Sequence, residues 1–155
     1  MSWTGYLKRT VPPVVAAAVL GGIGTKPTSA WYRGLDKPGW QPPPWVFGPV
    51  WTALYALTAA GTARAMAAAP TDDERRAIER HLWANMALNA GWCWLFFTAE
   101  KPKAALAEIV VLEASTLVLL KQLRDVDPAA HHLVAPYAAW NGFATALNAA
   151  IARRN

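Results

Sequence analysis

Long stretches without charged residues constrain the fold of this chain more than any other feature of its sequence. A helix that crosses a bilayer needs roughly 20 predominantly apolar residues. The uncharged or nearly uncharged stretches are residues 10–25, 38–63, 81–99, 104–120 and 128–152. Charged side chains make up only 16% of the chain, against about 25% in an ordinary soluble domain. We therefore predict an all-α fold: an integral membrane bundle of five transmembrane helices.

The expected helices form a single domain that covers residues 1–155. Their expected bounds are 7–25, 45–67, 77–99, 103–123 and 130–152. Lysine and arginine number eight on one expected face of the membrane and seven on the other, so the positive-inside rule assigns no orientation. The Ala- and Arg-rich composition is typical of bacteria, and the expected location is a bacterial cell membrane, crossed several times.

The connection between the first two expected helices, Lys26 to Pro44, is the longest one. Its density of proline and glycine rules out a long helix. It also carries Trp31, Tyr32 and Trp40, whereas a flexible linker would be rich in serine and glycine. We predict that this segment is an ordered loop that acts as a lid over one end of the bundle.

Two helix starts and one packing pattern are visible in the sequence. Thr71 precedes three acidic residues, and Asp127 precedes Pro128, so both are expected to cap helices. Small residues recur at four-residue spacing, as at Ala17 and Gly21, which lets helices approach closely. This spacing fits packing within the bundle and also fits a homodimer, and both interpretations stay open.

Aromatic and amide side chains share faces of three expected helices. They are Trp51 and Tyr55 on the second helix, Asn85, Asn89, Trp92 and Phe96 on the third, and Trp140 and Ala144 on the fifth, with Asn141 and Asn148 beside them. A buried amide without a partner costs about 1–3 kcal/mol. The amides therefore either join helix to helix or line a pocket with aromatic walls. Such a pocket suits a large, planar, mostly apolar ligand with a few polar groups.

Other reactive side chains give weaker signals. Glu108 and Glu113 point about 140° apart around their helix, so they are not expected to act as a pair, and Glu108 is expected to reach water, Lys101 or Lys103. A lone Cys93 excludes an intramolecular disulfide. No metal-ligand spacing, phosphate-binding loop or nucleic-acid-binding patch is present in the sequence. The histidines at 81, 131 and 132 lie near expected helix ends, where headgroup contact is favoured over ligation of haem iron.

Three blocks of sequence carry a family resemblance. They are Trp31-Tyr32, Leu35, Lys37-Pro38, Trp40, Pro42-Pro43, Trp45, Phe47, Trp51 and Leu54-Tyr55; then Ala87-Leu88-Asn89, Trp92 and Phe96-Phe97; then Pro136-Tyr137, Trp140 and Phe143 to Asn148. Their order and spacing over nearly the whole chain resemble the TspO/MBR family of tryptophan-rich sensory proteins. That family includes the mitochondrial translocator protein, or peripheral benzodiazepine receptor.

The resemblance implies a five-helix membrane bundle, often dimeric, whose first loop closes over a ligand pocket. Members bind porphyrins such as protoporphyrin IX and haem, and synthetic isoquinoline-carboxamide and benzodiazepine ligands. Trp140 matches a tryptophan tied to porphyrin breakdown in some bacterial members, and it would be catalytic only in that activity. The expected ligand-binding residues are Gly22, Trp40, Trp45, Trp51, Tyr55, Asn89, Trp92, Phe96, Trp140, Ala144 and Asn148.

The chain departs from the family at two places. Animal members bind cholesterol through a tyrosine followed by a basic residue near the end of the last helix, and residues 148–153 contain no tyrosine. Cholesterol binding through that motif is therefore not expected. Trp92 stands where other members vary, which affects the expected shape of the pocket.

The pocket and the resemblance favour a membrane protein that binds porphyrins or other tetrapyrroles and senses, sequesters or regulates them. No cofactor is required; porphyrin or haem is the ligand. Membrane lipid and a second copy of the chain are the other expected partners, and nucleic acid is not. Two alternatives stay open: a light- and oxygen-dependent enzyme that degrades porphyrin, and a transporter of tetrapyrrole or lipid.

Overall fold

The computed structural model describes residues 2–155, which contain helices and loops but no strand. The long helices are α1 (Leu7–Gly24), α3 (Pro44–Ala68), α4 (Asp72–Cys93), α5 (Pro102–Val126) and α6 (Pro128–Arg154). The short helical segments are η1 (Trp3–Tyr6), α2 (Ala30–Arg33) and η2 (Trp94–Thr98). The predicted all-α class is confirmed, and the three short helical segments are additional to the five predicted helices.

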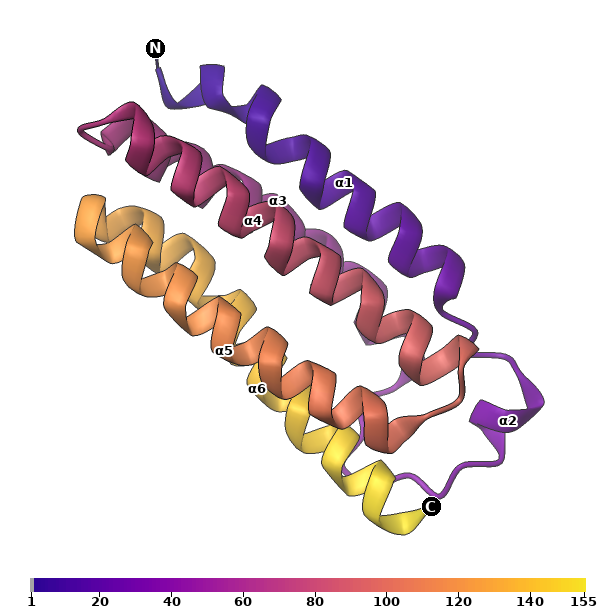
Figure 1. Ribbon diagram of the computed structural model, residues 1–155. Helices are drawn as coiled ribbons and strands as arrows, with labels where there is room; N and C mark the ends of the chain where they lie inside the picture. The colour runs from indigo at the N-terminus through magenta and orange to yellow at the C-terminus, as the bar shows by residue number, and fades with distance from the viewer. Residues whose placement is uncertain (1) are drawn as a thin grey trace.

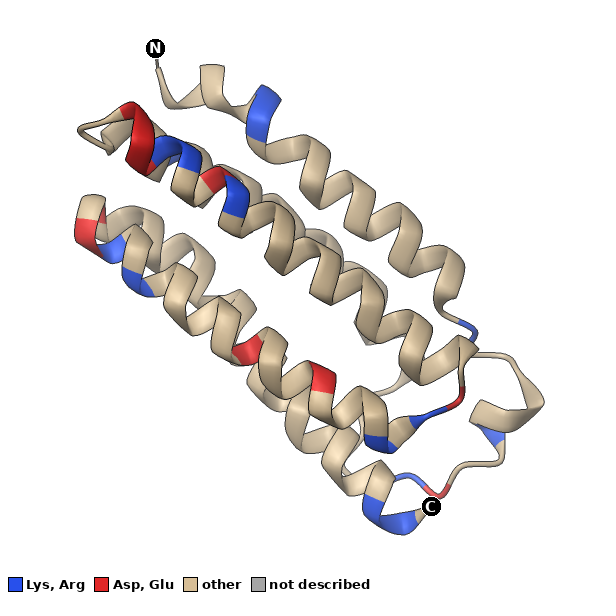
Figure 2. Cartoon of the chain, viewed as in Figure 1, with Lys and Arg blue, Asp and Glu red and all other residues tan. Residues whose placement is uncertain are grey.

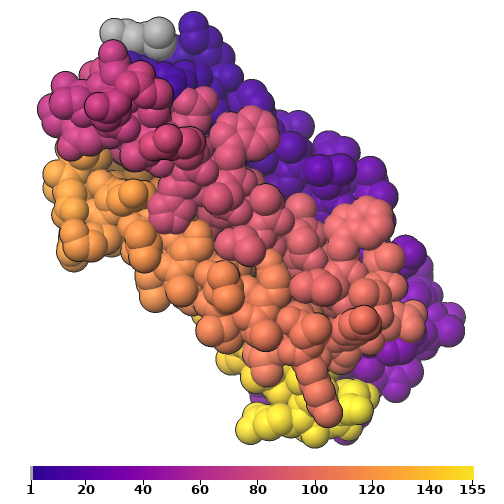
Figure 3. Space-filling view, in the orientation of Figure 1, coloured from indigo at the N-terminus to yellow at the C-terminus, as the bar shows by residue number. Residues whose placement is uncertain are grey.

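The long helices lie side by side with their axes roughly parallel or antiparallel (Figure 1). Helix α6 packs against α3 and α5, and α4 packs against α1 and α5; α4 and α5 together form much of the face seen in Figure 3. We call the end that carries α2 and the C-terminus the lid end (Figure 1). The opposite end, with the N-terminus and the turns α3–α4 and α5–α6, is the far end.

The predicted caps start α4 and α6. The Thr71 hydroxyl accepts a hydrogen bond from the Glu74 amide at 3.2 Å, and the Glu74 carboxylate accepts one from the Thr71 amide, which is a capping box. This cap makes a polar first turn helical, so α4 begins at Asp72 rather than at the expected residue 77. The Asp127 carboxylate caps α6 in a similar way.

The connection between α1 and α3 is ordered, as predicted. Ser29 caps α2 by accepting a hydrogen bond from the Tyr32 amide. The Lys37 ammonium donates to the Tyr32 carbonyl at 2.6 Å and lies 4.4 Å from the centre of the Tyr32 ring. The Gln41 amide donates to the Tyr32 hydroxyl at 2.9 Å, and the same ring packs edge-on against Phe96. These contacts hold the segment as a lid against η2.

Small residues bring neighbouring helices into close contact. A Cβ added at Gly61 of α3 would lie 2.5 Å from the Val134 side chain and 3.1 Å from a backbone carbonyl oxygen of α6. A Cβ added at Gly21 of α1 would lie 3.3 Å from the Cys93 sulfur of α4, and Ala17, one turn away, is buried too. This part of the small-residue pattern therefore serves packing within the chain.

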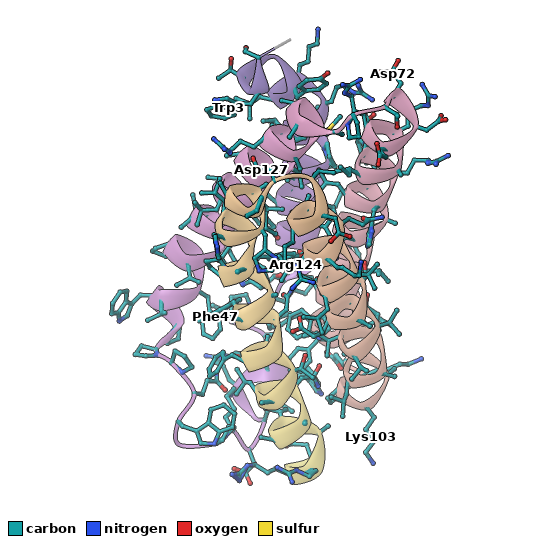
Figure 4. The ribbon with its side chains drawn as sticks, turned by 90° about the vertical axis from the view of Figure 1, so that its left-hand side faces the viewer. Trp3, Phe47, Asp72, Lys103, Arg124 and Asp127 are labelled. Carbon is teal, nitrogen blue, oxygen red and sulfur yellow. The ribbon has the colours of Figure 1, made fainter. Side chains whose placement is uncertain are left out.

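Charged residues gather at the two ends of the bundle, and the middle is nearly free of them apart from two acidic positions on α5 (Figure 2). Figure 4 shows Asp72 at the far end and Lys103 at the lid end. The far end contains ion pairs between helices, including Arg9 of α1 with Glu79 of α4. At the same end the Lys121 ammonium donates to Asp125 and lowers the pKa of that carboxyl.

The outward faces of α1 and α5 are apolar. Their exposed side chains are Val15, Val19, Leu20 and Ile23 on α1, and Val110, Val111, Leu117 and Val118 on α5. Within residues 2–155, hydropathy identifies no helix that combines the length and the apolar character needed to cross a membrane.

Gly61→Ala is expected to lower the free energy of unfolding by about 1–3 kcal/mol, because the added methyl group overpacks the α3–α6 contact. Gly48→Ala is the matched control in the same helix, because a Cβ there meets no atom within 4 Å. Thermal unfolding followed by circular dichroism measures both. A midpoint for Gly61→Ala equal to that of Gly48→Ala contradicts this account of the packing.

Candidate functional site

A cavity of about 530 Å³ lies between the lid and the core, and every long helix contributes to its wall. This volume falls within the roughly 300–1,000 Å³ of small-molecule sites. Tyr32 and Pro27 of the lid segment line it, and burial raises the pKa of the Tyr32 phenol although the hydrogen bond from Gln41 acts in the opposite direction. The lid therefore contributes a neutral phenol to the wall.

Most of the expected ligand-binding residues come together at this cavity. Those that line it are Gly22, Trp51, Tyr55, Asn89, Trp92, Phe96, Trp140, Ala144 and Asn148. They come from four different long helices and from η2, so the fold gathers residues that are far apart in the sequence. Contact between these side chains and a ligand stays a prediction.

Trp40 and Trp45 were also expected at the pocket, but they do not line the cavity. Trp45 is 75% exposed and Trp40 is 51% exposed. The inner face of α3 carries Phe47, Trp51 and Tyr55, which are four residues apart. Trp45 falls outside that spacing and points away from the bundle, so Phe47 takes the lining position near the start of the helix.

Aromatic rings that pack against one another form part of the cavity wall. The ring of Trp51 lies 5.5 Å from that of Tyr55 and 6.5 Å from that of Trp140, with the two indoles nearly perpendicular at 89°. Trp140 in turn packs on Phe47 at 5.9 Å and on Phe143 at 5.1 Å. These rings hold one another in place, which gives the cavity flat apolar surfaces that do not depend on a ligand.

The end of α4 widens into the π-helical turn η2 (Trp94–Thr98). Its hydrogen bond runs from the Ala99 amide to the Trp94 carbonyl at 2.8 Å. The wider turn directs two consecutive side chains inward, so Phe96 is 2% and Phe97 is 9% exposed and both line the cavity. Phe97 was not among the expected lining residues, because α-helical spacing does not place it on the same face as Phe96.

Buried amides add polar groups to the wall. The Trp92 indole N–H donates to Asn148 Oδ1 at 2.8 Å, and Asn148 Nδ2 donates to the Pro102 carbonyl at 2.9 Å. The Tyr55 hydroxyl donates to Asn89 Oδ1 at 2.7 Å. The two interpretations of these amides are therefore both correct, because the same side chains join helices and line the cavity.

Glu108 lies in a different environment from the expected one. Both of its carboxylate oxygens are buried without a hydrogen-bond partner among the described residues, so the prediction that it reaches water, Lys101 or Lys103 is wrong. Its carboxylate lies over Gly91 of α4, and that of Glu113 lies over Gly142 of α6. Neither acid lines the cavity.

Among the described residues, the cavity wall contains no histidine side chain. The histidines at 81, 131 and 132 do not line it. In the part of the chain that the structure covers, no group of three or more histidine, cysteine, aspartate or glutamate residues is placed to hold a metal ion. Cys93 lines the cavity and donates weakly to the Asn89 carbonyl.

Comparison with known proteins gives a consistent result. A model of the TspO/MBR family matches residues 10–154. The human translocator protein is 34% identical over 126 residues, which cover 81% of this chain and 75% of the relative. The tryptophan-rich sensory protein of Cereibacter sphaeroides is 32% identical over 155 residues, which cover 100% of this chain and 94% of the relative. The protein TspO of Chlorobaculum tepidum is 33% identical over 84% of this chain and 82% of its own length.

The fold and the cavity define a helical-bundle protein with an aromatic-walled cavity beneath an ordered lid. The chain belongs to the TspO/MBR family, since the family model covers nearly all of it. Members of this family are integral membrane helical bundles, and the resemblance found in the sequence is confirmed.

Trp92→Phe is expected to lower the free energy of unfolding by about 1–3 kcal/mol, since it leaves the buried Asn148 Oδ1 without its donor. Trp45→Phe changes the same ring in an exposed position and is expected to stay within about 0.5 kcal/mol of wild type. Chemical unfolding of both variants measures the difference. Equal stabilities would show that the Trp92–Asn148 bond does not support the cavity wall.

Proposed function

We propose that this protein binds a planar tetrapyrrole, such as protoporphyrin IX or haem, in the cavity, and that binding serves to sense, sequester or regulate the tetrapyrrole at a membrane. The observation that carries the proposal is the combination of aromatic rings and amides in the cavity wall. Trp51, Trp92 and Trp140 offer flat apolar surfaces, and buried amides supply a few directional contacts among them. Large planar rings with few polar groups match such a surface.

The charge distribution supports a ligand with carboxylates. The lid end carries the cations Lys26, Arg33, Lys37, Lys101, Lys103, Arg153 and Arg154, and the acids Asp36 and Glu100. None of those cations takes part in an ion pair within residues 2–155, whereas five cations toward the far end do: Arg9, Arg64, Arg75, Arg76 and Lys121. The excess of positive charge near the lid attracts anionic groups. The propionates of a porphyrin are such groups.

The names of the relatives agree with a binding role. They are called translocator proteins and tryptophan-rich sensory proteins, and these names describe movement or sensing rather than a reaction. The histidines lie outside the cavity wall, so the proposal includes no histidine ligand to haem iron. A second copy of the chain and membrane lipid are compatible with the apolar outer faces of α1 and α5.

Protoporphyrin IX is expected to quench tryptophan fluorescence saturably, and Trp51→Ala is expected to weaken its binding about tenfold or more through loss of stacking area. Gly22→Leu adds a side chain where a Cβ meets no atom within 4 Å at the cavity wall, so it is expected to block the site. Fluorescence titration in detergent measures these affinities.

Gly39→Leu is the matched control, because it adds the same side chain in open space outside the cavity lining. It is expected to bind protoporphyrin IX as wild type does. Non-saturable quenching in wild type, or equal affinities for the Gly22→Leu and Gly39→Leu variants, would contradict a specific site in this cavity.

One observation favours a second candidate, photo-oxidative degradation of porphyrin. The oxidisable indoles of Trp51 and Trp140 stand next to each other in the wall. If Trp140 carries this chemistry, Trp140→Phe is expected to slow the loss of porphyrin absorbance under light and oxygen by at least about tenfold while binding persists. Equal rates in wild type, in Trp140→Phe and in Trp45→Phe would leave binding as the function.

A further inference from the structure

A chain of hydrogen bonds continues from the cavity into the core between α4, α5 and α6. We propose that Asn85, which does not line the cavity, is a positioning residue that sets the direction of this chain. It thereby makes Tyr55 a hydrogen-bond acceptor, rather than a donor, toward the ligand. The inference rests on the proposed function, because it concerns the same cavity.

The direction is fixed by a group that can only accept. The Thr116 hydroxyl donates its single proton to the Leu112 carbonyl at 2.8 Å. Thr116 Oγ1 therefore acts as an acceptor toward its other neighbour, Asn85 Nδ2, at 2.9 Å. The second proton of the Asn85 amide goes to the Ser115 hydroxyl at 3.1 Å. With both protons engaged on α5, the Asn85 amide has one possible orientation.

The same logic extends along the chain to the cavity. Asn85 Oδ1 faces Tyr137, whose hydroxyl donates to it at 2.8 Å. The proton of Tyr137 is thereby used, so Tyr137 accepts from Asn89 Nδ2 at 3.1 Å. Asn89 Oδ1 must then face Tyr55, and the Tyr55 hydroxyl donates to it at 2.7 Å. Each link follows from the one before, back to the Leu112 carbonyl.

Tyr55 thus lines the cavity with its proton already engaged. Its remaining capacity toward a ligand is a lone pair, so it can bind an N–H or O–H group but cannot donate to a carbonyl or carboxylate. Asn85 and Tyr137 are 0% exposed and Asn89 is 3% exposed, so water has little access to reorient the chain. The low polarity of such a site makes each of these preferences stronger.

The Thr116 hydroxyl also orients a second amide, that of Asn141. This amide lines the cavity, is 0% exposed and directs Nδ2 to the Thr116 hydroxyl at 3.3 Å. Its Oδ1 has no partner among the described residues. Thr116 therefore orients two amides, and the Oδ1 of Asn141 is a buried acceptor beside the inner end of the cavity. Together they define the class of ligand group that binds there: a neutral hydrogen-bond donor, with any carboxylate of the ligand at the lid end.

Removal of Asn85 should reverse this preference. Without Asn85 Oδ1, the proton of Tyr137 is free to go to the Asn89 carbonyl, and the Asn89 amide turns its Nδ2 toward Tyr55. Tyr55 then accepts from Asn89 and has its own proton for the ligand. Trp51 and Trp140 also line the cavity, but they do not belong to the hydrogen-bond chain, so their contribution cancels when variants are compared.

The test compares two porphyrins that share the macrocycle and the propionates. Haematoporphyrin IX carries hydroxyethyl groups, which can donate, and diacetyldeuteroporphyrin IX carries ketones, which can only accept. Wild type is expected to bind the hydroxyethyl porphyrin roughly three- to tenfold more tightly, as one hydrogen bond allows. Asn85→Leu is expected to bring the ratio of the two affinities, hydroxyethyl over ketone porphyrin, to one or below. Tyr137→Phe, which removes only a hydroxyl, is expected to bring the same ratio toward one.

Asn148→Leu is the matched control, since it removes another buried amide that is not part of the hydrogen-bond chain. It is expected to weaken both porphyrins and leave their ratio unchanged, which is also what a merely structural role of Asn85 would produce. A ratio in Asn85→Leu and Tyr137→Phe equal to that of wild type overturns the proposal.

A second arm needs no ligand. The intensity ratio of the tyrosine doublet in the Raman spectrum is low for a phenol that donates its proton and high for one that accepts. The difference between wild type and Tyr55→Phe isolates the Tyr55 signal, which is expected to be that of a donor and to shift toward that of an acceptor in the Asn85→Leu background. An acceptor signature in wild type overturns the inference. A donor signature without any porphyrin binding overturns the proposed function alone.

Discussion

The structure depends on the requirement that polar groups buried between helices find partners. A buried amide or hydroxyl left unpaired costs about 1–3 kcal/mol, and this bundle contains several such groups at the inner end of its cavity. Thr116 donates to the Leu112 carbonyl, and the hydroxyl and amide groups from Asn85 to Tyr55 then orient in sequence. Because these bonds cross from α5 to α4, α6 and α3, they fix both the spacing of the helices and the chemistry of the cavity wall.

The other features of the site are arranged around this polar core. Aromatic rings form the sides of the cavity, a π-helical turn brings Phe96 and Phe97 inward together, and the lid covers the outer end through Tyr32. Within residues 2–155, the excess positive charge at the lid end takes part in no ion pair, whereas hydrogen-bond acceptors lie at the inner end. A ligand with carboxylates on one edge and a neutral or apolar opposite edge matches both ends at once, which is the connection between the charge distribution and the proposed tetrapyrrole.

Much of this arrangement could be predicted from the sequence, and the errors have physical causes. The caps at Thr71 and Asp127 depend on short-range hydrogen bonds, and four-residue spacing placed Trp51 and Tyr55 on one face, so local rules sufficed. Trp45 was expected at the cavity, but it lies on the outward face of α3 at the start of that helix. Phe97 was missed because a π-helical turn has no signature in the hydrophobic pattern. The hydrogen-bond chain from Thr116 to Tyr55 depends on contacts among residues far apart in the sequence, which spacing within one helix cannot show.

The most direct test of the account is an experimental structure of the protein prepared with protoporphyrin IX. The account predicts the macrocycle under the lid, stacked against Trp51 and Trp140, with its propionates directed toward the cations of the lid end. A macrocycle bound on the outer face of α1 or α5 with the cavity unoccupied, or one inside the cavity with its propionates against Tyr55 and Asn141, would contradict it.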